Sequence, residues 1–390
     1  MSEHAGKPEI RFAGFTETWE QRNTSYLGNF FKGQGYSKAD LLPVGTPIIL
    51  YGQLYTNYQF TITEVNTYAQ KKKNTILSKG NEVIVPASGE TAEDIARASA
   101  VRKKGVILGG DLNIIVPIPS MNAEFFALSL SNGFPQKKLA QKAQGKSVVH
   151  IHNSDIQEIS ITYPSLEEQN RIVTFFRHLD RLITLHQRKR GRLENIKKAM
   201  LEKMFPKNGS DVPEIRFAGF TEAWEQRKLG ELCNITTGKL DANAMVPDGR
   251  YDFYTSGIDV FKIDKAAFEG PAITIAGNGA SVGYMHLADG KFNAYQRTYV
   301  LTDFSADRQF LNVAIGNELP NKIQEEVRGS GIPYIVLNML TDLVTSLPSP
   351  KEQVAIGSFF ESLDNLITLH QRKVALLKNI KKACLEKMFI

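Results

Sequence analysis

The chain contains little cysteine and no long apolar run. Its 390 residues include two cysteines, Cys233 and Cys384, which are too few for a disulfide framework and lack the spacing of a zinc site. No stretch approaches the roughly 18 apolar residues of a membrane-spanning helix. The first residues lack the apolar core of a secretion signal. These absences predict a cytoplasmic protein without structural disulfides or metal.

Signatures of catalysis are also missing. Gly277 and Gly279 in GNGASVG follow a strand-like run, but Val282 stands where a dinucleotide fingerprint needs glycine or alanine. A tight turn between strands is the favoured interpretation. The Asn-Pro-Pro-Tyr motif of amino-directed DNA methyltransferases is absent, and the nearest match, ending at Tyr334, lacks the asparagine. The histidines show no metal-ligand spacing. The sequence therefore predicts a chain that is not an enzyme and holds no cofactor of its own.

What the sequence does contain is a long internal repeat. Residues 166–205 and 350–389 align without a gap, and 26 of these 40 positions are identical. A shorter word, PEIRFAGFTExWEQR, occurs at 8–22 and again at 213–227. The order is a short word, a variable body and a long helical segment, and then all three again.

Each long segment carries apolar residues at steps of three and four, the spacing of a coiled-coil seam. A histidine and a lysine interrupt each predicted seam, and polar residues at such positions fix register and choice of partner. Because matching seams can satisfy each other, the segments are predicted to pack together as a coiled coil. Placing each body at the opposite end of the pair requires the helices to be antiparallel. The alternative is two separate amphipathic helices, each on its own domain. The predicted seam residues are Leu179, Leu182, His186, Lys189, Leu193, Ile196 and Met200, with Leu363, Leu366, His370, Lys373, Leu377, Ile380 and Cys384 as counterparts.

The two variable bodies mix helix and strand signals. Residues 26–32, 121–132 and 310–328 are predicted as helices, and residues 251–254 and 272–276 as strands. The first body is 21 residues longer than the second. The predicted fold class is α+β: two mixed α/β domains joined by two long helices, with a pseudo-twofold internal repeat. The predicted segments are a first domain at 1–164, a first spacer helix at 165–205, a connector at 206–212, a second domain at 213–348 and a second spacer helix at 349–390.

Positive charge is concentrated in the helical segments. The whole chain carries +6, whereas the two long segments carry +8 and the remainder −2. Bodies that are nearly neutral cannot hold a polyanion by bulk charge, so a nucleic-acid site in them needs a local cluster.

Taken together, several motifs resemble the specificity subunit of type I restriction-modification systems, and the resemblance covers the whole chain. They are the two RFAGFTExWEQR words, the PSLEEQ and PSPKEQ starts of the helical segments, LDxLITLHQRK twice and NIKKAxLEKMF twice. YGQLYT and VPASGETAEDI in the first body, and AITIAGNGASVGY in the second, resemble two classes of target-recognition domain.

The resemblance implies that each body reads one half of a split double-stranded DNA sequence. It implies that the helices hold the halves at a fixed spacing, and that two methyltransferase subunits dock around them with restriction subunits outside. Because the helices form a rigid strut, the connector is predicted to help determine this spacing. S-adenosylmethionine, ATP and Mg are implied on those partners only. Two alternatives stay open: a related system whose partner both cleaves and methylates, and a two-headed protein that binds protein or sugar and has no salt-sensitive DNA affinity.

Polar residues in glycine-punctuated turns are the candidates for reading bases, since Arg and Lys pair with guanine and Asn and Gln with adenine. Each could equally be an ordinary turn residue. The candidates are Ser88, Glu90 and Arg97 in the first body, and Tyr254, Ser256, Asn278, Tyr295, Gln296 and Arg297 in the second. Basic clusters are predicted to touch phosphate, which positions without specifying: Lys71, Lys72, Lys73 and Asn74; Arg102, Lys103 and Lys104; and Lys137, Lys138, Lys142 and Lys146.

Overall fold

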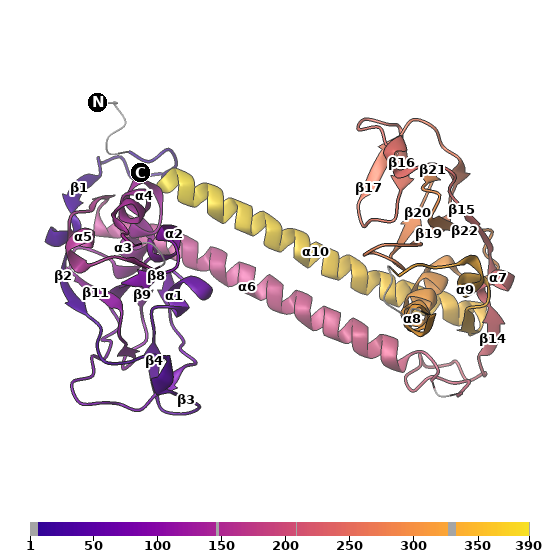
Figure 1. Ribbon diagram of the computed structural model, residues 1–390, viewed down its shortest axis with the longest axis horizontal. Helices are drawn as coiled ribbons and strands as arrows, with labels where there is room; N and C mark the ends of the chain where they lie inside the picture. The colour runs from indigo at the N-terminus through magenta and orange to yellow at the C-terminus, as the bar shows by residue number, and fades with distance from the viewer. Residues whose placement is uncertain (1–6, 146–147, 208, 327–332, 390) are drawn as a thin grey trace. The chain divides into compact units, whose positions relative to one another are not determined.

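The computed structural model describes residues 7–145, 148–207, 209–326 and 333–389 (Figure 1). The chain divides into two compact units: unit 1 contains residues 1–185 and 373–390, and unit 2 contains residues 186–372. Two long helices, α6 (Leu166–Lys203) and α10 (Pro350–Met388), each contribute residues to both units. The segments predicted from the sequence follow the two repeats. In the structure, by contrast, the C-terminal part of each long helix belongs to the compact unit that is built mainly from the other repeat.

Unit 1 consists mainly of short strands with helices packed on them. Before α6 its elements are β1 (Glu20–Asn23), η1 (Thr24–Tyr26), β2 (Gly28–Lys32), η2 (Lys38–Asp40), β3 (Leu41–Leu42), β4 (Thr46–Ile49), α1 (Gln53–Thr56), β5 (Thr61–Ile62), β6 (Tyr68–Ala69), β7 (Glu82–Pro86), β8 (Ser88–Gly89), α2 (Ala92–Ile95), β9 (Ser99–Val101), β10 (Ile107–Leu108), β11 (Leu112–Pro117), α3 (Ala123–Leu130), α4 (Gly133–Lys142), β12 (Val149–His150), α5 (Asn153–Gln157) and β13 (Ser160–Tyr163).

Two sheets organise unit 1. The five-stranded sheet has the order β2-β11-β7-β9-β5, and its central strand β7 is buried along its whole length, in agreement with the apolar run VIVP at 83–86. Helix α3 packs on this sheet and supplies Phe125 and Phe126 to the main core. A four-stranded sheet, β10-β4-β6-β3, has a small core of its own. The helix predicted for residues 26–32 is wrong: Tyr26 ends the short helix η1, and residues 28–32 form β2, which pairs with β11 in the large sheet.

Unit 2 has the same general plan with different sequence. Between α6 and α10 its elements are β14 (Glu225–Lys228), α7 (Leu229–Leu232), β15 (Asn234–Thr237), η3 (Ala242–Ala244), β16 (Tyr251–Tyr254), β17 (Val260–Ile263), β18 (Phe268–Glu269), β19 (Ala272–Ala276), β20 (Met285–Ala288), β21 (Lys291–Ala294), β22 (Thr298–Thr302), α8 (Arg308–Glu326), α9 (Leu337–Thr341) and β23 (Val344–Leu347). Its sheets have the orders β15-β22-β19-β20 and β17-β16-β21-β18.

The repeated short word has the same structural role in both units. In unit 1 the Trp19 ring packs edge-on against Phe125 with 6.0 Å between centroids, and in unit 2 Trp224 packs against Phe310 at 5.9 Å. The strand that follows pairs with the strand that leads into a long helix, β1 with β13 and β14 with β23. The short word and the helix start are therefore repeated together because they contact each other.

The long helices run antiparallel within each unit. In unit 1, Asp180 of α6 accepts a hydrogen bond from Lys381 of α10 at 2.5 Å, and the Phe176 ring contacts Phe389 beyond the end of α10. In unit 2, Lys197 donates to Asp364 at 2.6 Å. The histidines of the two long helices also meet in unit 2: His186 Nδ1 and His370 Nδ1 lie 2.9 Å apart and share a hydrogen bond. This pairing agrees with the predicted fold.

The position of the seam differs from the prediction in part. Leu179 and Leu363 are buried, and His186, Leu193, Met200, His370, Leu377 and Cys384 are half-buried. The prediction is wrong for Leu182, Lys189, Ile196, Leu366, Lys373 and Ile380, which are exposed. Leu182 is 42 % exposed, whereas its neighbour Ile183 is 8 % exposed. Both neighbours fit a three-and-four spacing, so only packing could choose between them.

Along the described residues, no helix is both long and apolar enough to cross a membrane.

Candidate nucleic-acid interface

In unit 2, the segments that follow β16, β19 and β21 meet at one edge of the domain. The backbone N–H of Tyr295 donates to the Tyr254 carbonyl at 2.9 Å, and the N–H of Gly277 donates to the Arg297 carbonyl at 2.8 Å. A Cβ atom on Gly277 would lie 2.4 Å from that carbonyl oxygen, so glycine is required for this approach. The fold thereby brings together the second-body candidates Tyr254, Ser256, Asn278, Tyr295, Gln296 and Arg297. We call this group the unit 2 edge.

The side chains of the unit 2 edge differ in accessibility. Gln296 and Arg297 are exposed, and Tyr295 and Asn278 are half-buried. The Ser256 hydroxyl donates to Asn278 Oδ1 at 2.6 Å, which holds the amide in one orientation and leaves its two N–H donors for another partner.

Tyr254 lies beneath this edge. It is 5 % exposed, and its ring packs edge-on against Phe292 with 5.4 Å between centroids. Burial raises the pKa of its hydroxyl, so the group stays protonated at neutral pH. Tyr254 thus packs beneath the loops and supports them, and it offers little accessible surface to a ligand.

One residue of this edge was missed by sequence reasoning. Tyr334 is 58 % exposed and forms an isolated antiparallel bridge with Asn278, while the Ile335 N–H donates to the Gly277 carbonyl at 2.7 Å. The sequence contained one clue. When the two repeats are aligned, the segment before α9 corresponds to the strand-like segment before α5, in which His150 of β12 pairs with Ser88 of β8. An aromatic side chain displayed at such a bridge is a natural surface for stacking.

Unit 1 gathers its base-reading candidates at a corresponding edge after β7. Ser88 is buried, and its Oγ shares a hydrogen bond with His150 Nδ1 at 3.0 Å. Glu90 is exposed in the following turn. The Arg97 guanidinium lies over the Tyr58 ring, 5.4 Å from its centroid. We call Ser88, Glu90 and Arg97 the unit 1 edge.

The basic clusters of unit 1 do not all lie with this edge. Glu82 at the start of β7 pairs with Val101, so the turn with Arg102, Lys103 and Lys104 lies at the opposite end of β7 from Ser88. Five strand residues separate the two ends by about 15 Å. Residues 71–74 are exposed on the segment that follows β6 in the smaller sheet.

The third cluster lies on or after α4, which packs against α2 and α3. Lys137 and Lys138 are exposed. Lys142 donates to Glu158 at 2.5 Å, and this hydrogen bond raises the pKa of the lysine. Lys146 lies outside the described residues. Because α4 packs against α2, which follows Glu90 closely, this cluster lies near the unit 1 edge.

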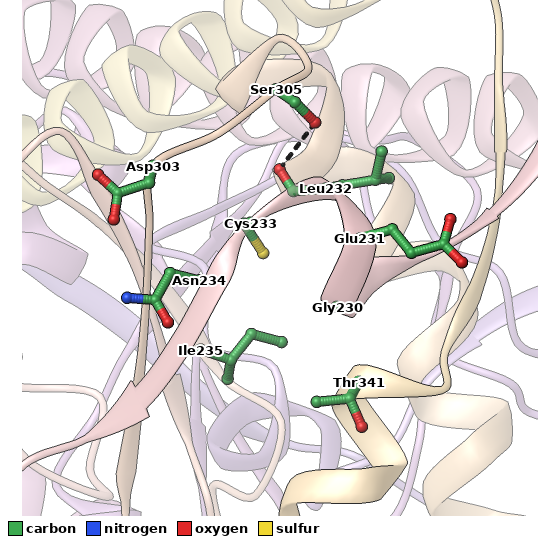
Figure 2. A pocket seen from close by; sticks show the side chains of 9 residues that line it. All are labelled: Gly230, Glu231, Leu232, Cys233, Asn234, Ile235, Asp303, Ser305 and Thr341. Carbon is green, nitrogen blue, oxygen red and sulfur yellow. Dashed lines mark hydrogen bonds between the residues drawn. The ribbon is translucent and has the colours of Figure 1, made fainter.

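Unit 2 also contains a pocket of about 460 Å³, away from the unit 2 edge. Its lining is Gly230, Glu231, Leu232, Cys233, Asn234, Ile235, Asp303, Ser305 and Thr341 (Figure 2). Burial raises the pKa of the Cys233 thiol to about 12, so it is not a thiolate at neutral pH. The Glu231 carboxylate accepts from Arg227 at 2.7 Å. Within the described residues, no three His, Cys, Asp or Glu side chains are grouped to hold a metal ion.

Comparison with known proteins decides the family. A family model described as the type I restriction modification DNA specificity domain matches residues 16–195 and 221–379. The chain belongs to this family. The two matched stretches follow the two repeats, so the chain is a specificity subunit with two such domains. Specificity subunits are the non-catalytic components of type I restriction-modification systems.

Curated relatives include other specificity subunits. The type I restriction enzyme EcoDI specificity subunit of Escherichia coli is 42 % identical over 157 residues, 40 % of this chain and 34 % of the relative. This chain thus matches about a third of that protein's length. The MjaVIII specificity subunit of Methanocaldococcus jannaschii is 25 % identical over 299 residues, 66 % of this chain and 67 % of the relative.

Solved structures show the same fold. The S subunit of a type I restriction-modification system from M. genitalium superposes with a TM-score of 0.69, covering 98 % of this chain and 99 % of the other at 17 % identity. A chain from a structure on complex assembly of the type I R-M system reaches a TM-score of 0.52 over 95 % of this chain and 97 % of the other, at 18 % identity.

Proposed function

We propose that this specificity subunit reads a bipartite double-stranded DNA sequence, one half with each unit. The observation that carries the proposal is the convergence of polar loop residues at one edge of each unit, on two bodies of unlike sequence that are attached to alike helices. Unlike bodies would read unlike half-sites. The bases themselves do not follow from these residues.

In unit 2, three accessible side chains have the chemistry of base reading. Arg297 would donate to guanine O6 and N7, and Gln296 and Asn278 match the N6 and N7 pattern of adenine. Tyr334 and Tyr295 would lie against the sugar or stack on a base. Lys137 and Lys138 in unit 1 would contact phosphate, which adds affinity that falls as salt rises.

The long helices would set the distance between half-sites. Helix α6 contains 38 residues and α10 contains 39. At 1.5 Å per residue each is about 57 Å long, on the order of one and a half turns of a duplex with about 34 Å per turn.

The exposed apolar residues of the helices support docking of two methyltransferase subunits. In unit 1, Leu182, Leu185, Leu376 and Ile380 are between 38 and 59 % exposed. In the heptad numbering of a coiled coil, these residues lie beside the buried seam, on the side of its g positions. The g positions of two antiparallel helices lie on the same side of the helix pair, so the four residues share one face. The same face recurs in unit 2 as Leu366, Leu369 and Ile196. Two equivalent apolar faces fit two equivalent partners, which would carry S-adenosylmethionine, while ATP and Mg would belong to the restriction subunits.

Mapping methylated adenines tests the base-reading proposal. The chain with Arg297→Ala should relax or change one position of a single half-site, and the other half-site should stay the same. Arg250→Ala is the matched control, because Arg250 is exposed at the opposite end of β16 from Tyr254. An unchanged methylation sequence in the Arg297 variant, or a change in both half-sites, would contradict the proposal.

A further inference from the structure

Strand β3 and the turn that follows it in unit 1 present an exposed apolar tip. Residues 41–44 read Leu-Leu-Pro-Val, and all four are exposed. Val44 is 81 % exposed, Leu42 45 % and Leu41 36 %. Four successive apolar residues left in water, with charged residues around them, indicate a contact surface. We call residues 41–44 the apolar tip.

The apolar tip is held on an ordered base. Leu41, the first residue of the tip, and Thr46, two residues after its end, both pair with Ala69 of β6. Gly45 packs so closely that a Cβ atom there would lie 2.7 Å from the Ala69 carbonyl oxygen. Beneath it lies the small core of Tyr36, Ile48, Leu50, Ala69 and Ile107. The tip therefore meets a partner without first having to be ordered.

Lysines lie on the two chain segments next to the apolar tip. Lys38, Lys71 and Lys73 are exposed on the segments before β3 and after β6. The nearby Asp40 carboxylate contacts the Lys72 ammonium at 2.5 Å, and hydrogen bonds from Lys72 and from the Ser37 N–H lower its pKa. Its negative charge is thus offset by Lys72, so these two segments carry the net positive charge of Lys38, Lys71 and Lys73.

We propose that the apolar tip is a wedge that enters the minor groove of DNA and unstacks one base step at or beside the half-site read by unit 1. Leucine and proline are among the side chains that proteins insert in this way, and flanking lysines would hold the phosphates on either side. The inference rests on the proposed DNA binding, but it concerns deformation of the duplex and not the reading of base edges.

Size and charge favour DNA over a protein partner. A stable protein interface covers about 800 Å² on each side, far more than four side chains of a turn present. A base step, in contrast, accepts one or two inserted side chains. The adjoining lysines match phosphate, which lines both sides of a minor groove. A wedge would also make the protein sensitive to how easily a step unstacks, so pyrimidine–purine steps would be favoured there without direct base contacts.

The experiment uses the chain assembled with its methyltransferase partner and a duplex containing its mapped site. 2-Aminopurine is placed in turn at each position in and around the first half-site. Besides the target adenine, which a DNA methyltransferase flips out of the stack, we expect a fluorescence increase on binding at one step only. The double variant Leu42→Asn with Val44→Asn should lose this increase and bind about ten-fold more weakly, with both half-site sequences unchanged. Phe134→Asn, on an equally exposed apolar side chain of α4, is the matched control and should retain the increase.

Variants of the flanking lysines distinguish phosphate contacts from insertion of the apolar tip. Lys71→Gln with Lys73→Gln should reduce the slope of log affinity against log salt by about 2 and keep the fluorescence increase. A double tip variant that still unstacks the same step would overturn the proposal. So would loss of methyltransferase assembly in the tip variant, which would assign the tip to a protein contact. A wild-type chain that binds and methylates without unstacking any step overturns only the wedge, whereas one that does not bind its DNA overturns the proposed function itself.

Discussion

A buried ion pair anchors the start of each long helix. Arg11 donates from Nε and Nη2 to the two carboxylate oxygens of Glu168, both at 2.7 Å, and the Glu168 side chain is 1 % exposed. Arg216 and Glu352 repeat this arrangement in unit 2. The hydrogen bond with Glu168 raises the pKa of Arg11. Each carboxylate also lies in the first turn of its helix, where the helix dipole favours negative charge.

Removing the arginine should therefore be costly. Arg11→Ala would leave the Glu168 carboxylate buried without its partner, and we expect a loss of about 3 kcal/mol in the free energy of unfolding of unit 1. Arg22→Ala is the control, since Arg22 is exposed and its loss should change stability by less than about 0.5 kcal/mol. Urea unfolding of both variants decides the matter, and equal effects would contradict a structural role for the pair.

His286 should make unit 2 sensitive to acid. Its ring lies 5.2 Å from Tyr254 and 4.9 Å from Tyr284, centroid to centroid, and burial lowers its pKa from 6.5. Between the lowered folded pKa and about 6.5, the unfolded chain binds a proton that the folded chain does not. Stability must then fall as the pH drops through this window. His286→Phe should lose part of this dependence, and its melting temperature should fall less than that of the wild type between pH 8 and pH 5. A parallel fall in both proteins would refute the assignment.

Among elements, the long helices have two apolar faces with separate roles. On one face of α6, Leu179 and Ile183 are buried in unit 1. On the other face, Leu182 and Leu185 are exposed to solvent. Neighbouring residues of one repeated word thus belong to different interfaces. Packing within the chain accounts for the first face, and the second is the face on which we propose that the methyltransferase docks.

Substitutions at adjacent positions should separate these roles. Ile183→Asp would bring a charge into the interior and should lower stability by about 3 kcal/mol or more. Leu182→Asp combined with Leu366→Asp should leave circular dichroism and melting unchanged but abolish co-purification with the methyltransferase. If the double variant unfolds, the exposed assignment is wrong, and if it still docks, the partner uses another face.

For the whole molecule, the question is which part measures the distance between half-sites. The sequence suggests that the connector 206–212 contributes with the helices. Both ends of the connector are held inside unit 2, where the Ile215 N–H donates to the Lys203 carbonyl and the Trp224 N–H donates to the Asp211 carbonyl, each at 2.8 Å. A connector tied at both ends to one unit has little influence on the other, which favours the helices alone.

Insertions should distinguish these possibilities. Seven residues added to α6 after Lys189 and seven to α10 after Lys373 preserve the heptad register and lengthen each helix by about 10 Å. The gap between half-sites should grow by about three base pairs, at about 3.4 Å each. Four residues added to the connector should leave the gap unchanged. Genome-wide mapping of methylated adenines gives both results, and a gap that follows the connector insertion would show that the connector takes part.

The sequence alone determined the plan of two units on two long helices, because identical words in equivalent contexts fold alike. Helix α6 spans Leu166–Lys203, within the predicted 165–205. Local signals also predicted β16 and β19 at their observed bounds, since short β-branched or aromatic runs between turns have few alternatives.

Tertiary structure alone decided what depended on distant partners. Residues 28–32 became a strand because β11 offered hydrogen bonds, and Ile183 was buried in preference to Leu182 because the core accepted only one of two equivalent stripes. The contacts of the unit 2 edge could likewise not be predicted from one sequence. Ser256 and Asn278 are 22 residues apart, and Tyr334 joins them from farther along the chain. Such contacts arise from the order of strands in a sheet, which local propensity does not encode.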